Sequence, residues 1–341
     1  MAILITGVAG FIGSNLARHL LAEQKAVIGI DNLCRGTLDN IAHLQGNPLF
    51  TFAQLDLADL AAYEQCVADY LQQETITEVW HLAANSDIPA GISDAAIDLQ
   101  DTFMTTYNTL EVMKRYQLPV LAFASTSAVY GDLGERVLDE DIGPLFPISN
   151  YGAMKLACEA LISASVEGFL ERAYIYRFPN VIGTPATHGV ILDFITKLQK
   201  TPGHLEVLGN GSQRKGYLHV HDLIDAMLAI QERAQDRINY FNIGAGDAGI
   251  YVRDIAQMVV QAVSPNAAIH YGQGDKGWVG DVPRFQYSVE KLKKLGWTPK
   301  LSSEQAVRLA IEQILVEQSR KWNKPWYWLA VKEHAYKSGC K

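Results

Sequence analysis

The sequence predicts an α/β protein with a doubly wound parallel sheet, followed by a smaller α/β domain. Short apolar runs of strand length alternate with longer segments whose apolar residues recur at helical spacing. A glycine-rich turn follows the first apolar run directly, which is typical of a strand that passes into a crossover helix. With 341 residues, 48% of them hydrophobic, the chain is long enough to form two domains with separate cores.

The first unit along the chain is a strand, a glycine turn, a helix and a second strand. Residues 3–5 and 26–30 are apolar runs, and leucines at helical spacing lie between them. Gly7, Gly10 and Gly13 follow the first run at a spacing of three. We expect the first glycine to permit a tight turn, the second a close approach to pyrophosphate, and the third close packing of helix on strand. This pattern predicts a Rossmann-type dinucleotide site at the helix N-terminus.

The second strand ends at Asp31, where a carboxylate can accept hydrogen bonds from the adenosine ribose hydroxyls. The same charge would repel a 2′-phosphate, so the sequence favours NAD over NADP. Arg35 lies near enough along the chain to weaken that preference.

Composition excludes several other classes of protein. The net charge of −8, with no compensating basic stripe, excludes a nucleic-acid-binding protein. No apolar stretch approaches the roughly 18 residues that a membrane span needs. Because the first apolar run already predicts a core strand, we expect no signal peptide. Its four cysteines form no CxxC pair and are typical of reduced thiols, so we expect a cytoplasmic protein.

The next elements continue the alternation. Residues 32–48 are polar and predict a loop, and residues 49–52 predict a third strand. Asp56 and Leu57 follow at the sheet edge, where an adenine would lie. Alternatively, Asp56 caps a helix that starts near Leu60.

Residues 78–84 predict a fourth strand that ends in Ala83 and Ala84, small enough for a nicotinamide to cross the strand ends. We expect His81 to be structural. A helix is expected over 102–116.

The fifth strand, 120–124, ends in three hydroxyl residues, 125–127, at the edge where α/β folds bind ligands. Tyr151 and Lys155 follow on a predicted helix, and their i, i+4 spacing puts phenol and ammonium on one face. A neighbouring cation favours phenolate, so this spacing predicts a tyrosine pKa lowered from about 10 toward neutrality.

These motifs together resemble the extended short-chain dehydrogenase/reductase family, in its group of nucleotide-sugar epimerases and dehydratases. The resemblance rests on residues 6–13 (TGVAGFIG), 31–34 (DNLC), 56–57 (DL), 81–84 (HLAA), 125–131 (STSAVYG), 151–155 (YGAMK) and 177–181 (RFPNV).

The resemblance implies an NAD cofactor, a nucleotide-sugar substrate, a role in polysaccharide biosynthesis and a homodimer formed through helices. Tyr151 would be the catalytic base, and Lys155 would hold the nicotinamide ribose. Thr126 matches the catalytic Ser/Thr position and Asn180 an asparagine that contacts substrate. The expected NAD-binding residues are Gly7, Gly10, Phe11, Ile12, Gly13, Asp31, Asn32, Asp56, Leu57, Ala83, Ala84, Tyr151 and Lys155.

The residues after Thr126 distinguish reactions within this group. Sugar 4,6-dehydratases carry Asp-Glu there, and decarboxylating relatives usually keep the glutamate, whereas this chain has Ser127 and Ala128. Residues 31–34 also resemble those of UDP-galactose 4-epimerases. Epimerisation at C4 through a 4-keto sugar is therefore the leading hypothesis. The alternatives are a nucleotide-sugar 4-dehydrogenase, 4-keto-reductase or dehydratase and, in another class, a non-catalytic NAD-binding sensor.

The C-terminal domain departs from the family pattern. In the segment 209–217, Lys215 and Gly216 stand where an arginine and an aspartate normally clamp the diphosphate. Lysine keeps the charge but loses the bidentate fork, so Lys215 is the expected substrate contact. Trp278 stands where a second arginine is usual, and Arg214, Lys276 and Arg284 are candidates to compensate.

Two histidines, His219 and His221, are expected on one face of a strand with Asp222 next to them. Because no further ligand is evident, we expect no metal site.

The predicted domains are interleaved. They comprise an NAD-binding domain over 1–179, to which 239–246 return, a substrate-binding domain over 180–318, and a C-terminal extension over 319–341. The extension combines basic and aromatic residues. We expect a helix that packs against its own domain or a dimer partner, and the alternative is attachment to an anionic membrane surface.

Overall fold

The computed structural model describes residues 1–134, 136–277, 282 and 284–322, and the side chains of these up to Arg320. The chain forms two compact units, 1–179 with 221–244 and 285–299, and 180–220 with 245–284 and 300–341. Among the described residues, no helix is long and apolar enough to cross a membrane.

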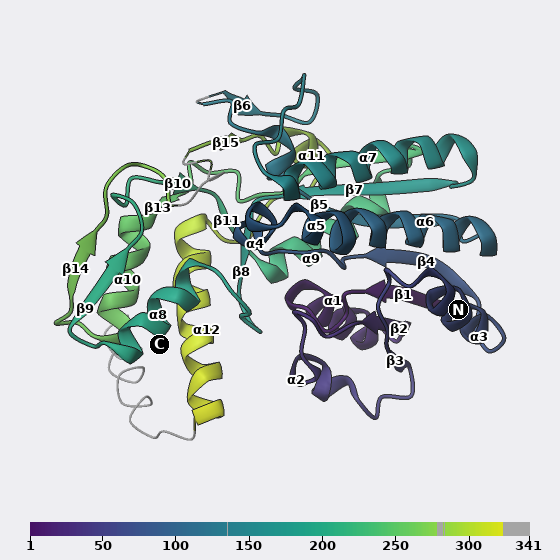
Figure 1. Cartoon of the computed structure of the whole chain (residues 1–341), viewed down its shortest axis with the longest axis horizontal. Coiled ribbons are helices and arrows are strands. Elements are labelled where there is room, and N and C mark those ends of the chain that lie inside the picture. The colour runs from purple at the N-terminus through teal and green to yellow at the C-terminus, as the bar shows by residue number, and fades with distance from the viewer. Residues whose placement is uncertain (135, 278–281, 283, 323–341) are drawn as a thin grey trace. The chain divides into compact units, whose positions relative to one another are not determined.

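The first unit is built on a parallel sheet of seven strands in the order β12-β7-β5-β4-β1-β2-β3 (Figure 1). The strands are β1 (Ala2–Thr6), β2 (Ala26–Asp31), β3 (Phe50–Gln54), β4 (Ile76–His81), β5 (Val120–Thr126), β7 (Arg172–Phe178) and β12 (Ile238–Asn242). The strand order reverses between β1 and β4, which is where doubly wound sheets bind ligands. The predicted fold class is confirmed.

The helical elements of this unit are α1 (Phe11–Ala22), α2 (Leu38–Ile41), η1 (Ala42–Leu44), α3 (Leu60–Leu71), α4 (Ile88–Ser93), α5 (Ala95–Asp98), η2 (Leu99–Met104), α6 (Thr105–Tyr116), η3 (Ser127–Tyr130), α7 (Asn150–Gly168), α9 (Val220–Arg233) and α11 (Glu290–Lys294). A small pair of strands, β6 (Val137–Leu138) and β15 (Gln286–Tyr287), completes it. The segment expected as a plain loop contains α2 and η1, because Ile41 and Leu44 are buried.

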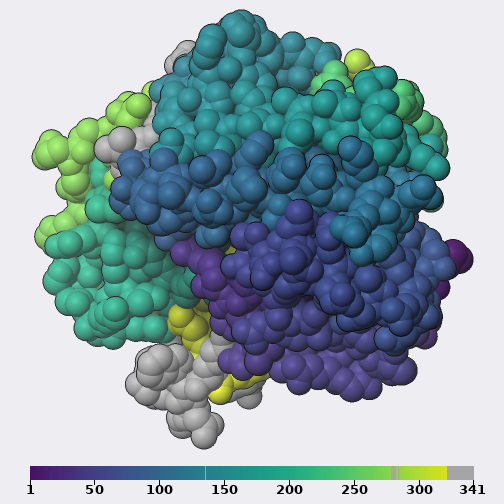
Figure 2. Space-filling model, turned by 45° about the vertical axis from the view of Figure 1, so that its right-hand side comes forward, coloured from purple at the N-terminus to yellow at the C-terminus, as the bar shows by residue number. Residues whose placement is uncertain are grey.

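Helices cover both faces of the sheet because each strand presents apolar side chains to both sides. On one face α3, α6 and α7 contact one another and bury the main core with alternate strand residues such as Leu4, Val79 and Phe123. In Figure 2 the blue atoms of α4 to α6 border the teal atoms of α7, in agreement with their contacts.

On the other face α9 packs over aromatic residues of the sheet. The phenols of Tyr174 and Tyr176 donate to the carbonyls of Gln231 and Met227 in α9. Arg18 of α1 contacts His221 at the start of α9, with 3.3 Å between Nη2 and Nε2. This face is therefore closed by α1 and α9.

The second unit has its own hydrophobic core, formed by α8 (Val190–Lys200), α10 (Val252–Val263) and α12 (Ser303–Trp322) with a two-stranded sheet. That sheet pairs β9 (His204–Val207) with β14 (Ala268–Tyr271). Two further pairs are β8 (Asn180–Ile182) with β11 (Tyr217–His219), and β10 (Arg214–Lys215) with β13 (Ile250–Tyr251). The C-terminal extension predicted from residue 319 onward is the end of α12 and a segment outside the described residues.

Candidate functional site

The end of β1 forms a glycine cradle against the chain that follows β4. Gly7 has a φ of +70°, and a Cβ there would fall 2.8 Å from the backbone nitrogen of Ala83. A Cβ on Gly13 would overlap the carbonyl oxygen of Gly7. Gly10 is the N-cap of α1 and brings no side chain to it, so backbone N–H groups form the helix N-terminus. The cradle has the shape and dipole that a pyrophosphate requires, and the donor set fits NAD.

Asp31 is buried at the end of β2, and both its oxygens accept backbone hydrogen bonds. Oδ2 accepts from Ala9 N at 2.9 Å and Oδ1 from Leu33 N at 2.8 Å. Burial raises the pKa of this carboxyl, and the hydrogen bonds oppose the rise. Because each carboxylate oxygen has a second lone pair, Asp31 is held rigidly and still has acceptor capacity for ribose hydroxyls.

The turn after β2 is fixed by its own side chains. The amide oxygen of Asn32 accepts from Cys34 N at 3.0 Å, and Leu33 has a φ of +61°. Arg35 Nη1 lies 3.0 Å from Asp87 Oδ2, so this cation is already paired with a carboxylate.

Asp56 is not the cap of the following helix. The N-cap of α3 is Asp59, whose side chain accepts from Ala62 N. Asp56 Oδ1 instead accepts from Ala58 N at 2.9 Å and closes a tight turn. Leu57 is buried, and its carbonyl accepts from Asn108 Nδ2 at 2.8 Å. The capping interpretation is wrong, because α3 begins one turn later than Asp56 can reach.

His81 is a structural residue. It is fully buried and surrounded by threonines, with Nδ1 2.8 Å from Thr6 Oγ1 and Nε2 3.1 Å from Thr106 Oγ1. Burial and the charge of Lys155 lower its pKa to about 3, so the ring is neutral. Ala83 and Ala84, which follow, are half-buried at the strand end.

Thr126, Tyr151 and Lys155 meet where β5 ends beside α7. Thr126 Oγ1 shares a hydrogen bond with the Tyr151 phenol and also accepts from Ala128 N at 3.1 Å. Ser149 caps α7 through Gly152 N, which begins the helix just before Tyr151. Lys155 Nζ donates to the Ala124 carbonyl at 2.6 Å.

The Lys155 ammonium is buried, with 2% of the residue exposed. It lies 4.5 Å from the centroid of the Phe123 ring and 6.0 Å from that of Tyr151. Desolvation lowers its pKa to about 8. Because this pKa lies close to neutral pH, a small change in the surroundings of Lys155 decides whether it is charged.

The pKa of Tyr151 does not follow the expectation from spacing alone. Burial raises it to about 12, although the hydrogen bond with Thr126 opposes the rise. The i, i+4 spacing brings the ammonium to the ring, but Lys155 Nζ is directed to the Ala124 carbonyl. In the chain by itself desolvation therefore outweighs the cation, and the phenol is protonated at neutral pH.

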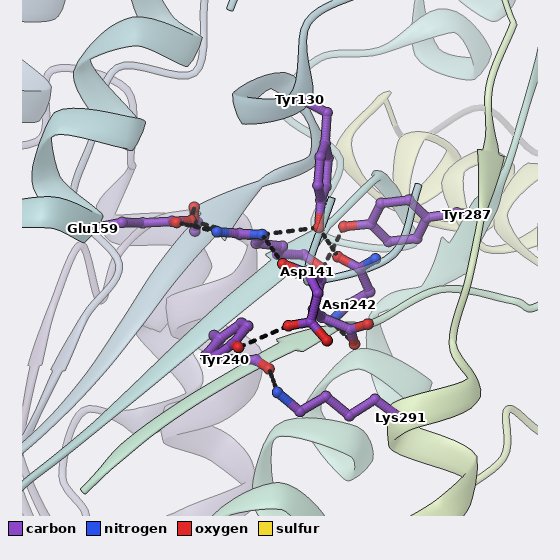
Figure 3. A network of polar contacts seen from close by, with 10 residues as sticks. Tyr130, Asp141, Glu159, Tyr240, Asn242, Tyr287 and Lys291 are labelled. Carbon is purple, nitrogen blue, oxygen red and sulfur yellow. Dashed lines mark hydrogen bonds and ion pairs between the residues drawn. The ribbon is translucent and has the colours of Figure 1, made fainter. Parts of the chain in front are cut away.

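A second buried cation, Arg177, lies at the end of β7, and its partner Glu159 on α7 is labelled in Figure 3 together with Tyr130 and Asn242. Its Nη2 is 2.6 Å from Glu159 Oε2, and its Nη1 donates to the Tyr130 phenol at 3.0 Å. Ser125 Oγ donates to the same glutamate. Desolvation favours loss of the proton, but the hydrogen bonds and charge of Glu159 outweigh it and raise the pKa of Arg177.

This network extends to the returning strand β12. The Tyr130 phenol donates to Asn242 Oδ1 at 2.7 Å, and Asn242 N donates to Glu140 Oε1 at 2.8 Å. Sequence reasoning missed Glu159, Glu140 and Asn242. The available signal was a glutamate one turn after Lys155 on an otherwise apolar face of the helix.

Asn180 and Lys215 both belong to the second unit, on two separate pairs of strands, β8 with β11 and β10 with β13. Asn180 pairs with Tyr217, and its Nδ2 lies 3.4 Å from the Gly216 carbonyl. Lys215 pairs with Ile250. The structure therefore brings these two predicted substrate residues into one region of the second unit.

Two guanidinium groups gather beside the ring of Tyr251. Arg214 lies 5.0 Å and Arg253 4.3 Å from the centroid of the Tyr251 ring. Arg284 forms an isolated bridge with Arg214. Trp278 lies outside the described residues.

The two histidines expected on one strand are on different elements. His219 ends β11 and is buried, with Nε2 3.0 Å from Gln313 Oε1, whereas His221 is already in α9 and exposed. The apolar residue between them, Val220, is fully buried and starts the helix. Across the described part of the chain, no three His, Cys, Asp or Glu side chains are grouped to hold a metal ion.

Comparisons with known proteins agree with this geometry. Residues 3–244 match the model of the NAD dependent epimerase/dehydratase family. The chain is 28% identical over 314 residues to a putative UDP-glucose 4-epimerase of Methanocaldococcus jannaschii, covering 91% of this chain and 97% of the relative. It is 29% identical over 341 residues to the dTDP-glucose 4,6-dehydratase of Haemophilus influenzae, covering 94% and 99%.

Among solved structures, the chain is similar to a UDP-galactose 4-epimerase with a TM-score of 0.80 and 33% identity, covering 93% of this chain and 99% of that one. Together with the glycine cradle and the Thr126, Tyr151 and Lys155 cluster, these matches establish the cofactor as NAD. The chain belongs to the NAD-dependent epimerase/dehydratase family of nucleotide-sugar enzymes.

Proposed function

We propose that the protein inverts C4 of a nucleotide-diphosphate sugar through a transient 4-keto intermediate. The observation that carries the proposal is the composition of η3, directly after Thr126. Its first two residues are Ser127 and Ala128, so no carboxyl stands beside the catalytic hydroxyl. Elimination of water across C5 and C6 needs an acid and a base there. The active centre instead has the groups for moving one hydroxyl proton.

In this proposal Tyr151 is the base that takes the C4 hydroxyl proton and later returns it. Thr126 shares a hydrogen bond with the phenol and orients it toward that hydroxyl. Lys155, fixed by the Ala124 carbonyl, holds a ribose hydroxyl and stabilises the phenolate by its charge. NAD, when bound, supplies a hydride acceptor and a positively charged nicotinamide ring. Because hydride leaves and returns in one cycle, the cofactor should remain bound.

The residues proposed to hold NAD are those of the cradle and the sheet edge: Gly7, Gly10, Phe11, Ile12, Gly13, Asp31, Asn32, Asp56, Leu57, Ala83 and Ala84. The glycine conformation and the two fixed oxygens of Asp31 support this assignment. The turn closed by Asp56 is the proposed support for adenine.

The second unit is proposed to bind the nucleotide sugar. Lys215 would contact the diphosphate, and the guanidinium groups beside Tyr251 would compensate for the missing bidentate arginine. Asn180, next to Gly216, would contact the sugar. This assigns the first unit to NAD and the second to substrate.

The test is to incubate the full chain with UDP-, dTDP-, GDP- and CDP-sugars without added cofactor, following products by NMR and bound NADH by absorbance. We expect an isomer of equal mass and about one NAD per chain after purification. Net NADH with a released keto sugar would make it a dehydrogenase, and loss of water a dehydratase. Tyr151→Phe is the matched inactive variant. Full biological activity in that variant would support a non-catalytic sensor.

We also propose a homodimer formed through the helices around α6. Leu99 and Tyr107 are 40% and 38% exposed on η2 and α6, and Phe103, half-way between them, is partly buried. Their i, i+4, i+8 spacing forms an apolar stripe. Tyr107→Lys should convert a dimer to a monomer in light scattering. We place the enzyme in the cytoplasm because the described cysteines, Cys34, Cys66 and Cys158, are free thiols.

A further inference from the structure

Asp98, the last residue of α5, is a completely buried carboxyl that no sequence pattern singled out. None of its surface is exposed. Asn85 Nδ2 donates to Oδ1 at 2.8 Å, whereas Oδ2 has no hydrogen-bond partner among the described residues. Leaving a buried carboxylate oxygen unpaired is costly, and such groups cluster at functional sites.

The chain makes room for this carboxyl at a glycine. A Cβ on Gly91 of α4 would overlap Asp98 Oδ2, so only glycine leaves space for the oxygen. The Gly91 carbonyl accepts from Asn150 Nδ2 at 2.9 Å, and Asn150 is the residue before Tyr151. Because α4 and α5 both contact α7, the pocket of Asp98 is attached to the helix that carries Tyr151 and Lys155.

The charge of Asp98 acts on both of those residues. It raises the pKa of Lys155 and that of Tyr151, although burial is the larger influence on each. Three acidic groups act on Lys155, namely Cys158, Glu159 and Asp98, and neutral His81 is also close. Burial raises the pKa of the Cys158 thiol, so it carries no charge at neutral pH. Glu159 is neutralised by Arg177 at 2.6 Å. Asp98 is thus the carboxyl facing Lys155 whose charge no ion pair already neutralises.

Charged groups on three surrounding elements, α4, η2 and α7, act on Asp98. Asp87 at the start of α4 and Asp101 in η2 are carboxyls, and Lys155 in α7 is the cation. Asp87 is paired with Arg35. Asn85, which donates a hydrogen bond to Asp98, is neutral.

We propose that Asp98 is a positioning residue, whose buried carboxylate supplies a fixed negative charge to the Tyr151–Lys155 pair and so keeps Lys155 in its ammonium form. The proposal rests on the roles given above to Tyr151 and Lys155. It adds a third group, on a different helix, that sets the pH range in which the pair acts.

A double-mutant cycle tests this coupling without any substrate. The variants are Asp98→Asn, Lys155→Met and their combination in the NAD-loaded full chain, compared by urea unfolding at pH 7. We expect the two substitutions to be non-additive by at least tenfold in the unfolding equilibrium constant, because each removes the partner charge of the other. Asp101→Asn is the matched control, a carboxyl of the next turn, and should be additive with Lys155→Met within about twofold. Asp98→Ala repeats the cycle should the amide fold poorly.

The pH profile of kcat/KM gives the second readout. Removing the negative charge makes Lys155 and Tyr151 lose their protons more easily, so both limbs of the profile should move to lower pH by about one unit. A purely structural role would lower the rate at every pH and leave both limbs in place. Additive unfolding, or unmoved limbs, overturns the proposal. If the wild type turns over no nucleotide sugar, the proposed function fails while the unfolding cycle still decides the role of Asp98.

Discussion

Lys155 on α7 and Arg177 at the end of β7 are both buried cations, but they differ in their polar partners. Arg177, 7% exposed, has a carboxylate at 2.6 Å, a phenol at 3.0 Å and the carbonyl of Glu140 at 3.3 Å. Lys155, 2% exposed, has one carbonyl and an aromatic ring, and within the described chain it forms no ion pair. The pKa is raised at the first cation and lowered to about 8 at the second.

This difference separates a structural charge, that of Arg177, from the charge of Lys155, which we propose to be catalytic. The Arg177 ion pair and its hydrogen bonds connect β5, α7, β7 and β12 through Ser125, Glu159 and Asn242. An incompletely satisfied cation is costly for the fold but responds to its surroundings, which a group that assists proton transfer must do. Replacing Lys155 should therefore lower the catalytic rate, whereas replacing the partner of Arg177 should lower the stability of the fold.

The largest effect is expected for Lys155→Met. It should lower kcat by about 10³-fold, because phenolate stabilisation and ribose binding are lost together, while the chain still folds, since methionine removes the cost of desolvating the buried ammonium. Steady-state kinetics and circular dichroism measure the two properties. Lys197→Met, at an exposed lysine of α8, is the control and should keep normal kcat. A Lys155→Met variant that fails to fold would show that Lys155, like Arg177, is needed for folding.

Glu159→Gln tests whether the ion pair of Arg177 stabilises the fold. It leaves the Arg177 charge buried without a counter-charge and should lower the free energy of unfolding by about 3–5 kcal/mol, measured in urea. Glu304→Gln removes an exposed carboxylate paired with Arg308 and should change that free energy by less than about 0.5 kcal/mol. If the two variants were equally stable, the Arg177 network would not be what locks the strands.

The pH dependence of the free energy of unfolding should show what it costs to bury the charged ammonium of Lys155. Its pKa is about 8 in the folded chain and 10.5 as its ordinary value. Between these pH values the unfolded chain binds more protons, so the wild type gains stability as pH rises through this window, by up to about 3 kcal/mol. Below pH 8 the penalty is fully present. Lys155→Met should lack this gain, and identical pH curves for the two proteins would contradict a penalty at this lysine.

Ser125→Ala should have the smallest effect. Ser125 donates to Glu159, but Arg177 Nε also donates to Oε1 of that glutamate at 3.0 Å, so no buried acceptor is abandoned. The expected loss is about 1 kcal/mol in the free energy of unfolding, with kcat close to normal because Thr126 remains on β5. A kcat reduced as strongly as by Thr126→Ala would show that Ser125 belongs to the catalytic cluster.

The sequence by itself determined the features that depend on short spacing. The glycine turn, the alternation of strands and helices and the Tyr151–Lys155 helix were all predictable, since a strand period of two, a helix period of 3.6 and the glycine conformation are local properties. Local patterns also placed Thr126 at a strand end, and the structure extends β5 to that residue.

Only the tertiary structure decided how these groups are charged and what holds them. The raised pKa of Tyr151, the ion pair of Arg177 with Glu159 and the unpaired oxygen of Asp98 all arise from desolvation by segments distant in sequence. The cap of α3 and the split of His219 from His221 depended on where helices begin. Spacing along the chain specifies which residues share a face, whereas the cost of burying a charge depends on every atom packed around it.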